Sequence, residues 1–317
     1  MGAENSSPEP QNGKVVRFLN NDNRSNVDHE KLEQMRQEHE SHFNVDENTT
    51  NEDFYNYRNS SNVEAAMKYL HDLGSCVNHI EPDDTQEYCQ NGVNEKILFI
   101  VCNNYKRPDY QLGVGPIDDA LTVAIHHKKM GYNIIFLHNS TPHHFKKWLK
   151  HILQNTLSDL TIFYTGHGSQ IRDVSGDESD GYDEVMIFDD GYIVDDDLGD
   201  YLHKYAHGQR IVLLTDCCHS GSIWDIQSLK AEHENVAPNI ISIAAATDAE
   251  TSKQTKLGQK DHGIFTYFFW NTFNENPMIS TVEMKNKIDP ILSRFRQMLD
   301  FCGTSDGIEN EPIFPDQ

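Results

Sequence analysis

The sequence predicts an α/β fold built on a mostly parallel β-sheet with helices on both of its faces. From residue 95 onward, short apolar segments alternate with amphipathic ones, which is the pattern of strands connected by crossover helices. Two of the apolar segments end in polar, glycine-containing turns that carry His167 and Cys218. In open α/β sheets, ligands bind at the carboxyl ends of the strands, so both turns are candidates for a functional site.

The alternation can be followed in order along the chain. Apolar segments predict strands at residues 96–102, 132–137, 160–165, 211–215 and 240–246, with a short hairpin strand at 184–188. Helices are expected at residues 117–130, 142–153, 195–205, 264–274 and 281–299. Ser140 or Thr141 followed by Pro142 is typical of a helix N-cap with proline in the first turn. The polar residues 225–239 and 248–262 are expected to form loops.

The N-terminal third has a different composition. Residues 1–95 contain 19 Asp and Glu against 7 Lys and Arg, so 12 of the 24 excess negative charges lie there. This composition predicts disorder, interrupted by possible helices at His29–His42 and Val63–Leu73. We therefore expect an acidic, largely disordered prodomain-like region at 1–90 and a folded domain at 91–317. Composition leaves open whether the first region lies on the folded core.

Charge and cysteine content bound the partners and the compartment. A net charge of −24 over 317 residues argues against nucleic acid or an anionic membrane as the main partner, because both need basic patches. No secretory pattern or membrane-length apolar run occurs, and six scattered cysteines favour the reducing cytoplasm. The first six residues fit a myristoylation pattern at Gly2, but with no second signal stable membrane anchoring is not expected.

The two strand-end turns suggest a cysteine hydrolase. Cys218 follows His167 by 51 positions (218 − 167), similar to the spacing of about 50 residues in caspases. His167 can act as the base for a thiol nucleophile, and the backbone N–H groups of Gly168 and Cys218 are candidate oxyanion donors. Side chains alternate along a strand, so only one of Cys217 and Cys218 can face His167. Zinc binding by Cys217, Cys218 and His219 is disfavoured, because consecutive ligands suit a tetrahedral site poorly.

Four motifs together resemble the metacaspases, the caspase-like cysteine peptidases of clan CD, family C14. They are Tyr-Thr-Gly-His-Gly-Ser-Gln at 164–170, Asp-Gly-Tyr-Asp-Glu at 180–184, Ile-Val-Asp-Asp-Asp at 193–197 and Asp-Cys-Cys-His-Ser-Gly-Ser at 216–222. The resemblance implies a caspase-hemoglobinase-like fold, a His167–Cys218 dyad and a monomeric, type I-like arrangement. Thr165 stands where the family usually has Ser, and the segment 113–120 departs from the family pattern before Asp119.

The resemblance also implies protein or peptide substrates cleaved after Arg or Lys. By family position, Asp119 and Asp216 line the pocket for that basic residue, with Thr165 beside it. A pocket lined by carboxylates in an acidic chain would attract a positively charged substrate side chain. The competing interpretation of Asp216 is a strand-end carboxylate that caps local backbone.

Residues 173–200 hold twelve carboxylates and no Lys or Arg. A solvated acidic loop is the usual interpretation of such a run, and the EF-hand pattern does not fit it. The resemblance instead implies calcium bound by Asp183, Asp195, Asp196 and Asp225, with Glu184 and Asp197 as the neighbouring alternatives. Calcium would then order the loops around the nucleophile.

Self-cleavage of a zymogen would follow from specificity for basic residues. The candidates lie in the polar segments of 226–262: Lys230, Lys253, Lys256 and Lys260. The leading hypothesis is a calcium-activated cysteine endopeptidase specific for Arg and Lys. A calcium-responsive scaffold with little proteolytic activity, and a peptidase specific for Asn or Asp, are the alternatives.

Overall fold

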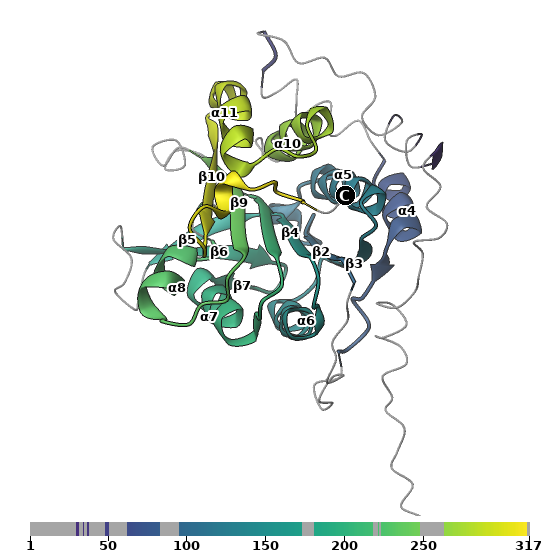
Figure 1. Cartoon of the computed structure of the whole chain (residues 1–317). Coiled ribbons are helices and arrows are strands. Elements are labelled where there is room, and N and C mark those ends of the chain that lie inside the picture. Colours follow the sequence, from purple (N-terminus) through teal and green to yellow (C-terminus); the bar gives the residue numbers. More distant parts are fainter. Residues whose placement is uncertain are drawn as a thin grey trace, which may run out of the picture.

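The computed structural model describes residues 62–82, 95–172, 181–217, 223–247 and 263–315, together with positions 30, 31, 34, 37, 48–50 and 221. Its centre is a seven-stranded sheet in the order β1-β3-β2-β4-β8-β9-β10 (Figure 1). These strands are β1 Ser75–Cys76, β2 Ile97–Cys102, β3 Asn133–His138, β4 Leu160–Thr165, β8 Ile211–Asp216, β9 Ile240–Thr247 and β10 Gln297–Gly303. A second sheet contains β5 Gly168–Arg172, β6 Tyr182–Phe188 and β7 Gly191–Val194.

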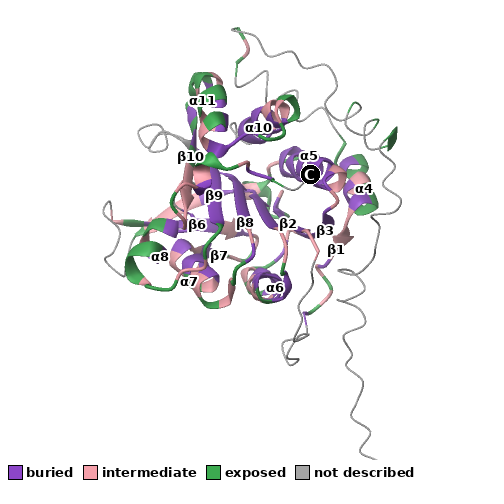
Figure 2. Ribbon diagram, in the orientation of Figure 1, coloured by how far each residue is buried: buried purple, intermediate pink, exposed green. Residues whose placement is uncertain are grey.

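Helices cover both faces of the main sheet (Figure 1). The helices of one face are α4 Val63–Leu73, α5 Gly115–Lys129, α10 Ile264–Glu275 and α11 Thr281–Leu292, and those of the other are α6 Pro142–Asn155, α7 Asp195–Tyr205 and α8 Ile226–Glu232. Each face has its own apolar core, and successive residues of a strand supply them in turn: Leu98 and Ile100 face one core, Ile97 and Phe99 the other. This is the alternation expected of a strand buried on both sides (Figure 2).

The expected architecture is confirmed. In the seven-stranded sheet the neighbouring strands from β1 across to β9 pair in parallel, and β10 alone is antiparallel, to β9. The bounds of α4, α7 and β4 coincide with the predicted ones, and Thr141 is the N-cap of α6, since its hydroxyl accepts the N–H of His144 at 3.1 Å. No described helix is long and apolar enough to cross a membrane.

Two local predictions were wrong. The helix expected to reach residue 299 ends at Leu292, and Arg296, with φ 59°, turns the chain into β10. The residues after it alternate between buried and exposed with period two, which fits an edge strand. The polar segment 225–239, expected as a loop, contains α8, whose Ile226 and Leu229 are buried in a core.

The N-terminal segment contributes to this domain. Leu70 and Leu73 of α4 pack in the core with α5, and β1 pairs in parallel with β3. Residues 62–82 therefore pack on the sheet, although they precede the boundary at 90/91 suggested by composition, and the position of that boundary stays a prediction. The helix expected at His29–His42 lies almost wholly outside the described residues.

Candidate active site

His167 lies in a tight turn between β4 and β5, and its side chain is only 2% exposed. Thr165 at the end of β4 pairs with Asp216 at the end of β8, so the histidine turn and the segment after Asp216 leave adjacent strands. Cys217 is 3% exposed and belongs to the core on the α6 face, as expected for the packed member of the cysteine pair. Cys218 lies outside the described residues.

The imidazole of His167 is held by a backbone carbonyl. Its Nε2 lies 2.8 Å from the carbonyl oxygen of Tyr110, in the connection between β2 and α5. A carbonyl can only accept, so Nε2 carries the proton and donates it. In the neutral ring the lone pair is then on Nδ1, the nitrogen that would take a proton from a thiol.

Two buried tyrosines hold the backbone of the histidine turn. The hydroxyl of Tyr105 accepts the N–H of His167 at 2.6 Å, and the hydroxyl of Tyr164 donates to the His167 carbonyl at 2.7 Å. Burial raises the pKa of both phenols, so both remain protonated donors at neutral pH. The backbone of His167 is therefore fixed at both its N–H and its C=O.

The carbonyl of Ile187 in β6 joins this turn to the second sheet. It accepts from the hydroxyl of Tyr105 at 2.9 Å and from the side-chain amide of Asn103 at 3.3 Å, and it lies 2.9 Å from the hydroxyl of Tyr164, whose single proton it shares with the carbonyl of His167. Ile187 also donates its N–H to the carbonyl of His167 at 3.1 Å. One residue of β6 thus contacts three elements that surround the histidine.

The backbone N–H of Gly168 is not used for pairing with β6. Because Ile187 donates to His167, the next pair of the β5–β6 ladder, Gly168 with Met186, falls at a non-hydrogen-bonded position. The N–H of Gly168 therefore points away from β6. This orientation agrees with the role predicted for it, which stays a prediction.

The three residues expected near the substrate pocket lie together. The hydroxyl of Thr165 donates to Asp119 of α5 at 3.3 Å, and Thr165 is the cross-strand neighbour of Asp216. Both carboxylates are buried, at 0% and 1% exposure. Asp216 also binds the start of α10, because it accepts from the N–H and the hydroxyl of Thr266 at 3.0 and 2.6 Å. Asp216 therefore has a structural role, although its partners belong to α10 and not to the local backbone considered from the sequence.

The four residues expected to bind calcium divide into two groups. Asp196 and Asp225 line one hollow of about 350 Å³, together with Asp200, Glu232 and His233. Asp183 and Asp195 do not line it, and Asp195 instead accepts the backbone N–H groups of Glu184 and Asp196. Among the described residues, no three acidic, histidine or cysteine side chains are grouped as a metal site.

Burial shapes the acidity of this region. It raises the pKa of Asp195 to about 8, since desolvation penalises the carboxylate. Asp197, one of the neighbouring alternatives, forms an ion pair with Lys146 at 2.5 Å and so is engaged with α6. The carboxylates that line the hollow are the donor type that calcium prefers, and binding of the ion by Asp196 and Asp225 stays a prediction.

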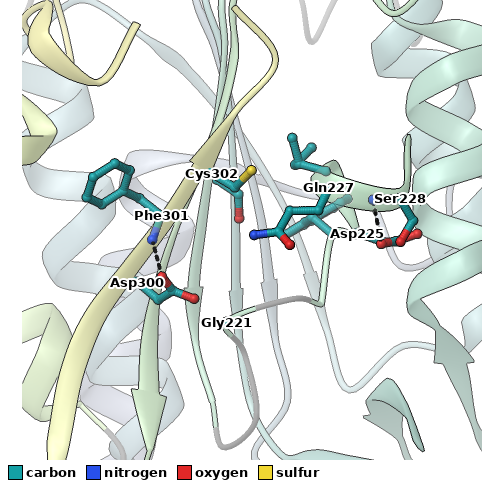
Figure 3. A pocket seen from close by; sticks show the side chains of 10 residues that line it. Gly221, Asp225, Gln227, Ser228, Asp300, Phe301 and Cys302 are labelled. Carbon is teal, nitrogen blue, oxygen red and sulfur yellow. Dashed lines mark hydrogen bonds between the residues drawn. The ribbon is translucent and has the colours of Figure 1, made fainter. Parts of the chain in front are cut away.

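A second hollow, of about 170 Å³, lies between the segment after the nucleophile and β10 (Figure 3). Gly221, Gln227 and Asp225 line one side and Cys302 the other. Asp225, the N-cap of α8 with a left-handed backbone (φ 44°), lines both hollows.

The candidate cleavage positions are only partly described. Lys230 lies in the last turn of α8 rather than in a loop, and its ammonium group donates to the carbonyl of Gly303 at 3.1 Å. The helix and this contact place it in ordered backbone, which differs from the loop expected for it. Lys253, Lys256 and Lys260 lie outside the described residues.

Tyr105, Tyr110 and Ile187 were missed by the sequence-based interpretation. Tyr110 and Ile187 act through backbone atoms, which any residue type could supply, so no sequence signal identifies them. Tyr105 stands in a polar connection after β2, where an isolated aromatic residue could have been noticed.

The fold and the paired strand ends define a caspase-like α/β protein, and comparison with known proteins agrees. Residues 100–227 match the family model described as metacaspase, peptidase C14 domain. Metacaspase-1A of Neurospora crassa is 34% identical over 156 residues, which are 47% of this chain and 31% of that protein. Metacaspase III c of Phaeodactylum tricornutum is 42% identical over 85 residues, 24% of this chain and 25% of that protein. Residues 100–227 of this chain are therefore similar to the metacaspase peptidase C14 domain.

The fold also has a counterpart among solved structures. The crystal structure of protein GSU0716 from Geobacter sulfurreducens superposes with a TM-score of 0.51 at 22% identity, covering 70% of this chain and 97% of that one. This likeness concerns the fold. The segments matched in the two metacaspases above span less than a third of the length of those proteins.

Proposed function

We propose that this protein is a calcium-activated cysteine endopeptidase that cleaves after Arg or Lys. The observation that carries the proposal is that the imidazole of His167 is anchored by a hydrogen bond. His167 follows β4, and β4 pairs with β8, the strand that precedes Cys218. The metacaspase family match supports the same reaction class.

The geometry suggests how the reaction would proceed. The carbonyl of Tyr110 keeps the proton of His167 on Nε2, so Nδ1 takes the proton of the Cys218 thiol. The thiolate attacks the substrate carbonyl, and the N–H of Gly168 stabilises the oxyanion. The imidazolium of His167 then gives its proton to the leaving amine, and water hydrolyses the thioester.

Buried acidic groups favour a basic substrate residue. Asp119 and Asp216 are both neighbours of Thr165, and a guanidinium or ammonium group would find two buried carboxylates in a setting poor in water. A substrate with Asp before the cleaved bond would be repelled by the same charges.

Calcium activation is proposed from the hollow lined by Asp196 and Asp225. These residues belong to the start of α7 and the start of α8, so an ion bound to both would fix α8 and the nucleophile segment that precedes it. The ion would supply structural order and take no part in bond cleavage. We propose self-cleavage in the segment 226–262 on the same specificity, with Lys253, Lys256 and Lys260 favoured over the helical Lys230.

Hydrolysis of matched fluorogenic peptides tests the proposal. Peptides that end in Arg, Lys, Asn or Asp are offered to the full chain with and without millimolar calcium, beside Cys218→Ala and Cys217→Ala. We expect cleavage of the Arg and Lys peptides that needs calcium and Cys218 and survives loss of Cys217. If no peptide is cleaved while calcium still raises the melting temperature, the calcium-responsive scaffold is the better description.

A further inference from the structure

We infer that Tyr105 is a positioning residue for His167, which sets both the backbone of the histidine turn and the plane of the imidazole ring. The inference rests on the proposed peptidase function, because it assigns a role within that catalytic site. Tyr105 lies in the connection between β2 and α5 and is 3% exposed. Among the described residues, its hydroxyl bonds to His167 and Ile187 and not to β8, the strand that precedes Cys218.

The first contact is between rings. The aromatic ring of Tyr105 stacks on the imidazole of His167, with centroids 4.9 Å apart and planes inclined by 28°. Tyr110 meets the same imidazole edge-on, with centroids at 5.9 Å and planes at 61°. The Nε2 bond to the Tyr110 carbonyl fixes one end of the imidazole, but a single hydrogen bond still allows the ring to rock. The stacked face of Tyr105 removes that freedom.

The second contact is made by the hydroxyl. It accepts the N–H of His167 at 2.6 Å and donates to the carbonyl of Ile187 at 2.9 Å, so it bridges the histidine turn and β6. A Cβ atom on Gly166 would lie 2.8 Å from this oxygen, which shows how closely the turn is wrapped around it. Ring and hydroxyl therefore act on the same residue from two directions.

Tyr105 is itself held in an unfavourable backbone conformation. Its φ of 62° is in the left-handed region, which a bulky residue adopts only when the surroundings impose it. The side-chain oxygen of Asn139 imposes it, because it accepts the N–H groups of Tyr105 at 2.8 Å and of Asn104 at 2.9 Å. This conformation carries a cost, and the contacts of Tyr105 with His167 depend on it.

The ring has a further effect in the charged state. The imidazole becomes an imidazolium during the reaction, and an aromatic face over a cation is attractive. Without the ring of Tyr105, the imidazole of His167 would therefore spend less time in its reactive orientation. Its charged form, the imidazolium, would also be less stable. Both effects act on the chemical step, whereas the proposed pocket for the basic substrate residue, at Asp119 and Asp216, is left in place.

Two variants separate the contacts. Tyr105→Phe keeps the stacked ring and loses the hydroxyl, and Tyr105→Leu loses both. Tyr192→Phe and Tyr192→Leu are the matched controls, since Tyr192 of β7 is 52% exposed. Calcium-loaded full-length proteins are compared by kcat and KM on an Arg peptide, by melting temperature, and by NMR of the His167 ring protons, which a stacked aromatic ring displaces.

We expect kcat to fall about 10-fold in Tyr105→Phe, which loses the two hydrogen bonds of the hydroxyl but keeps the ring, and on the order of 10²-fold in Tyr105→Leu, with KM changed less than about 2-fold in both. The ring protons of His167 should move in Tyr105→Leu and stay near their wild-type positions in Tyr105→Phe. Should Tyr105→Leu not fold, Asn139→Ala, which releases the backbone of Tyr105, is expected to show the same loss of kcat.

The outcomes that overturn the inference are distinct from failure of the proposed function. A folded Tyr105→Leu protein with wild-type kcat, or with a change confined to KM, would refute a positioning role. If the wild-type protein cleaves no peptide, the proposed function fails, and the NMR measurement alone then tests whether Tyr105 orients the ring of His167. Unchanged His167 ring protons in Tyr105→Leu would in that case refute the stacking as well.

Discussion

The Nε2 atom of His167 lies 2.8 Å from the carbonyl oxygen of Tyr110, so the backbone orients the imidazole that we propose for the dyad. The position of that carbonyl depends on how the loop that carries it is held. The short helix Pro108–Tyr110 follows Lys106 and Arg107, whose N–H groups are both bound by Asp189.

The first prediction concerns Asp189. Its carboxylate accepts from the N–H of Lys106 at 2.9 Å and of Arg107 at 3.3 Å, so Asp189→Ala should loosen the loop that ends at Tyr110. We expect kcat to fall about 3- to 10-fold with little change in the melting temperature, because misplacement of an orienting group affects the chemical step first. Asp190→Ala, at the exposed neighbouring position, is the control. Equal activity of the two variants would contradict the prediction.

The second prediction concerns Gly166. An added Cβ would lie 2.8 Å from the hydroxyl of Tyr105 and 3.1 Å from that of Tyr164. Gly166→Ala should therefore push both hydroxyls away from His167, lowering the free energy of unfolding by about 1–3 kcal/mol and kcat on the order of 10²-fold. Urea unfolding and peptide hydrolysis check both effects. Gly208→Ala, where no atom lies within 4 Å of the new Cβ, should leave both unchanged.

The third prediction separates the two roles of Asp225. Its side chain caps α8 by accepting the N–H of Ser228 at 3.3 Å, and its backbone is left-handed. Asparagine keeps the cap and tolerates this conformation but lacks the charge, so Asp225→Asn should melt like wild type without calcium. Wild type should gain about 2.7 kcal/mol at a hundredfold excess of calcium over its Kd, and the variant much less.

Calorimetry with and without calcium measures this difference. Asp300→Asn serves as the matched control, because Asp300 is exposed and lines only the smaller hollow. A calcium-dependent gain that persists undiminished in Asp225→Asn would remove this residue from the proposed ligand set.

The fourth prediction concerns pH and His127. Burial lowers its pKa from 6.5 to about 3, and its Nδ1–H donates to the carbonyl of Val123 at 2.9 Å. Above pH 6.5 the imidazole is neutral in both folded and unfolded chains, so its contribution to stability is fully present. As the pH falls below 6.5 only the unfolded chain takes up the proton, and stability is lost until the folded pKa is passed.

At pH 4.5 this loss amounts to about 2–3 kcal/mol for His127 alone. His127→Phe should lose less stability than wild type between pH 7 and pH 4.5, as measured by urea unfolding at each pH. The exposed His143→Phe should follow the wild-type slope. If the free energy of unfolding falls with pH equally in His127→Phe and wild type, the loss of stability does not come from protonation of His127.

Much of the fold could be predicted because its strands are continuous apolar segments. β4 and α7 were predicted to the residue, since one is a six-residue apolar run and the other begins after Val194 with three aspartates in its first turn. β10 was missed because Gln297–Gly303 follows a helical pattern directly and its exposed residues resemble a helix surface. β5 and β7 are only five and four residues long, and their pairing with β6 depends on tertiary structure.

The sequence could predict only those parts of the candidate site in which a side chain plays the proposed role. His167, Asp119 and Thr165 were identified by type and position, and the structure brings Asp119 and Thr165 within hydrogen-bonding distance. The carbonyls of Tyr110 and Ile187 have no side-chain signature. The division of the acidic residues between the interior and the hollow depends on which face of α7 is buried, and three consecutive aspartates do not reveal it.

Strand β6 has a mechanical consequence for this protein. Asp183 lies near one end, and Ile187, whose carbonyl receives three donors beside the histidine, lies four residues further on, about 13 Å away. β6 pairs with β5 over Tyr182–Met186 and with β7 over Val185–Phe188, so only its middle is hydrogen-bonded on both sides. The acidic segment and the turn of His167 are thus joined by one continuous, paired backbone, and any order imposed at Asp183 would be passed to Ile187 through covalent bonds and strand pairing.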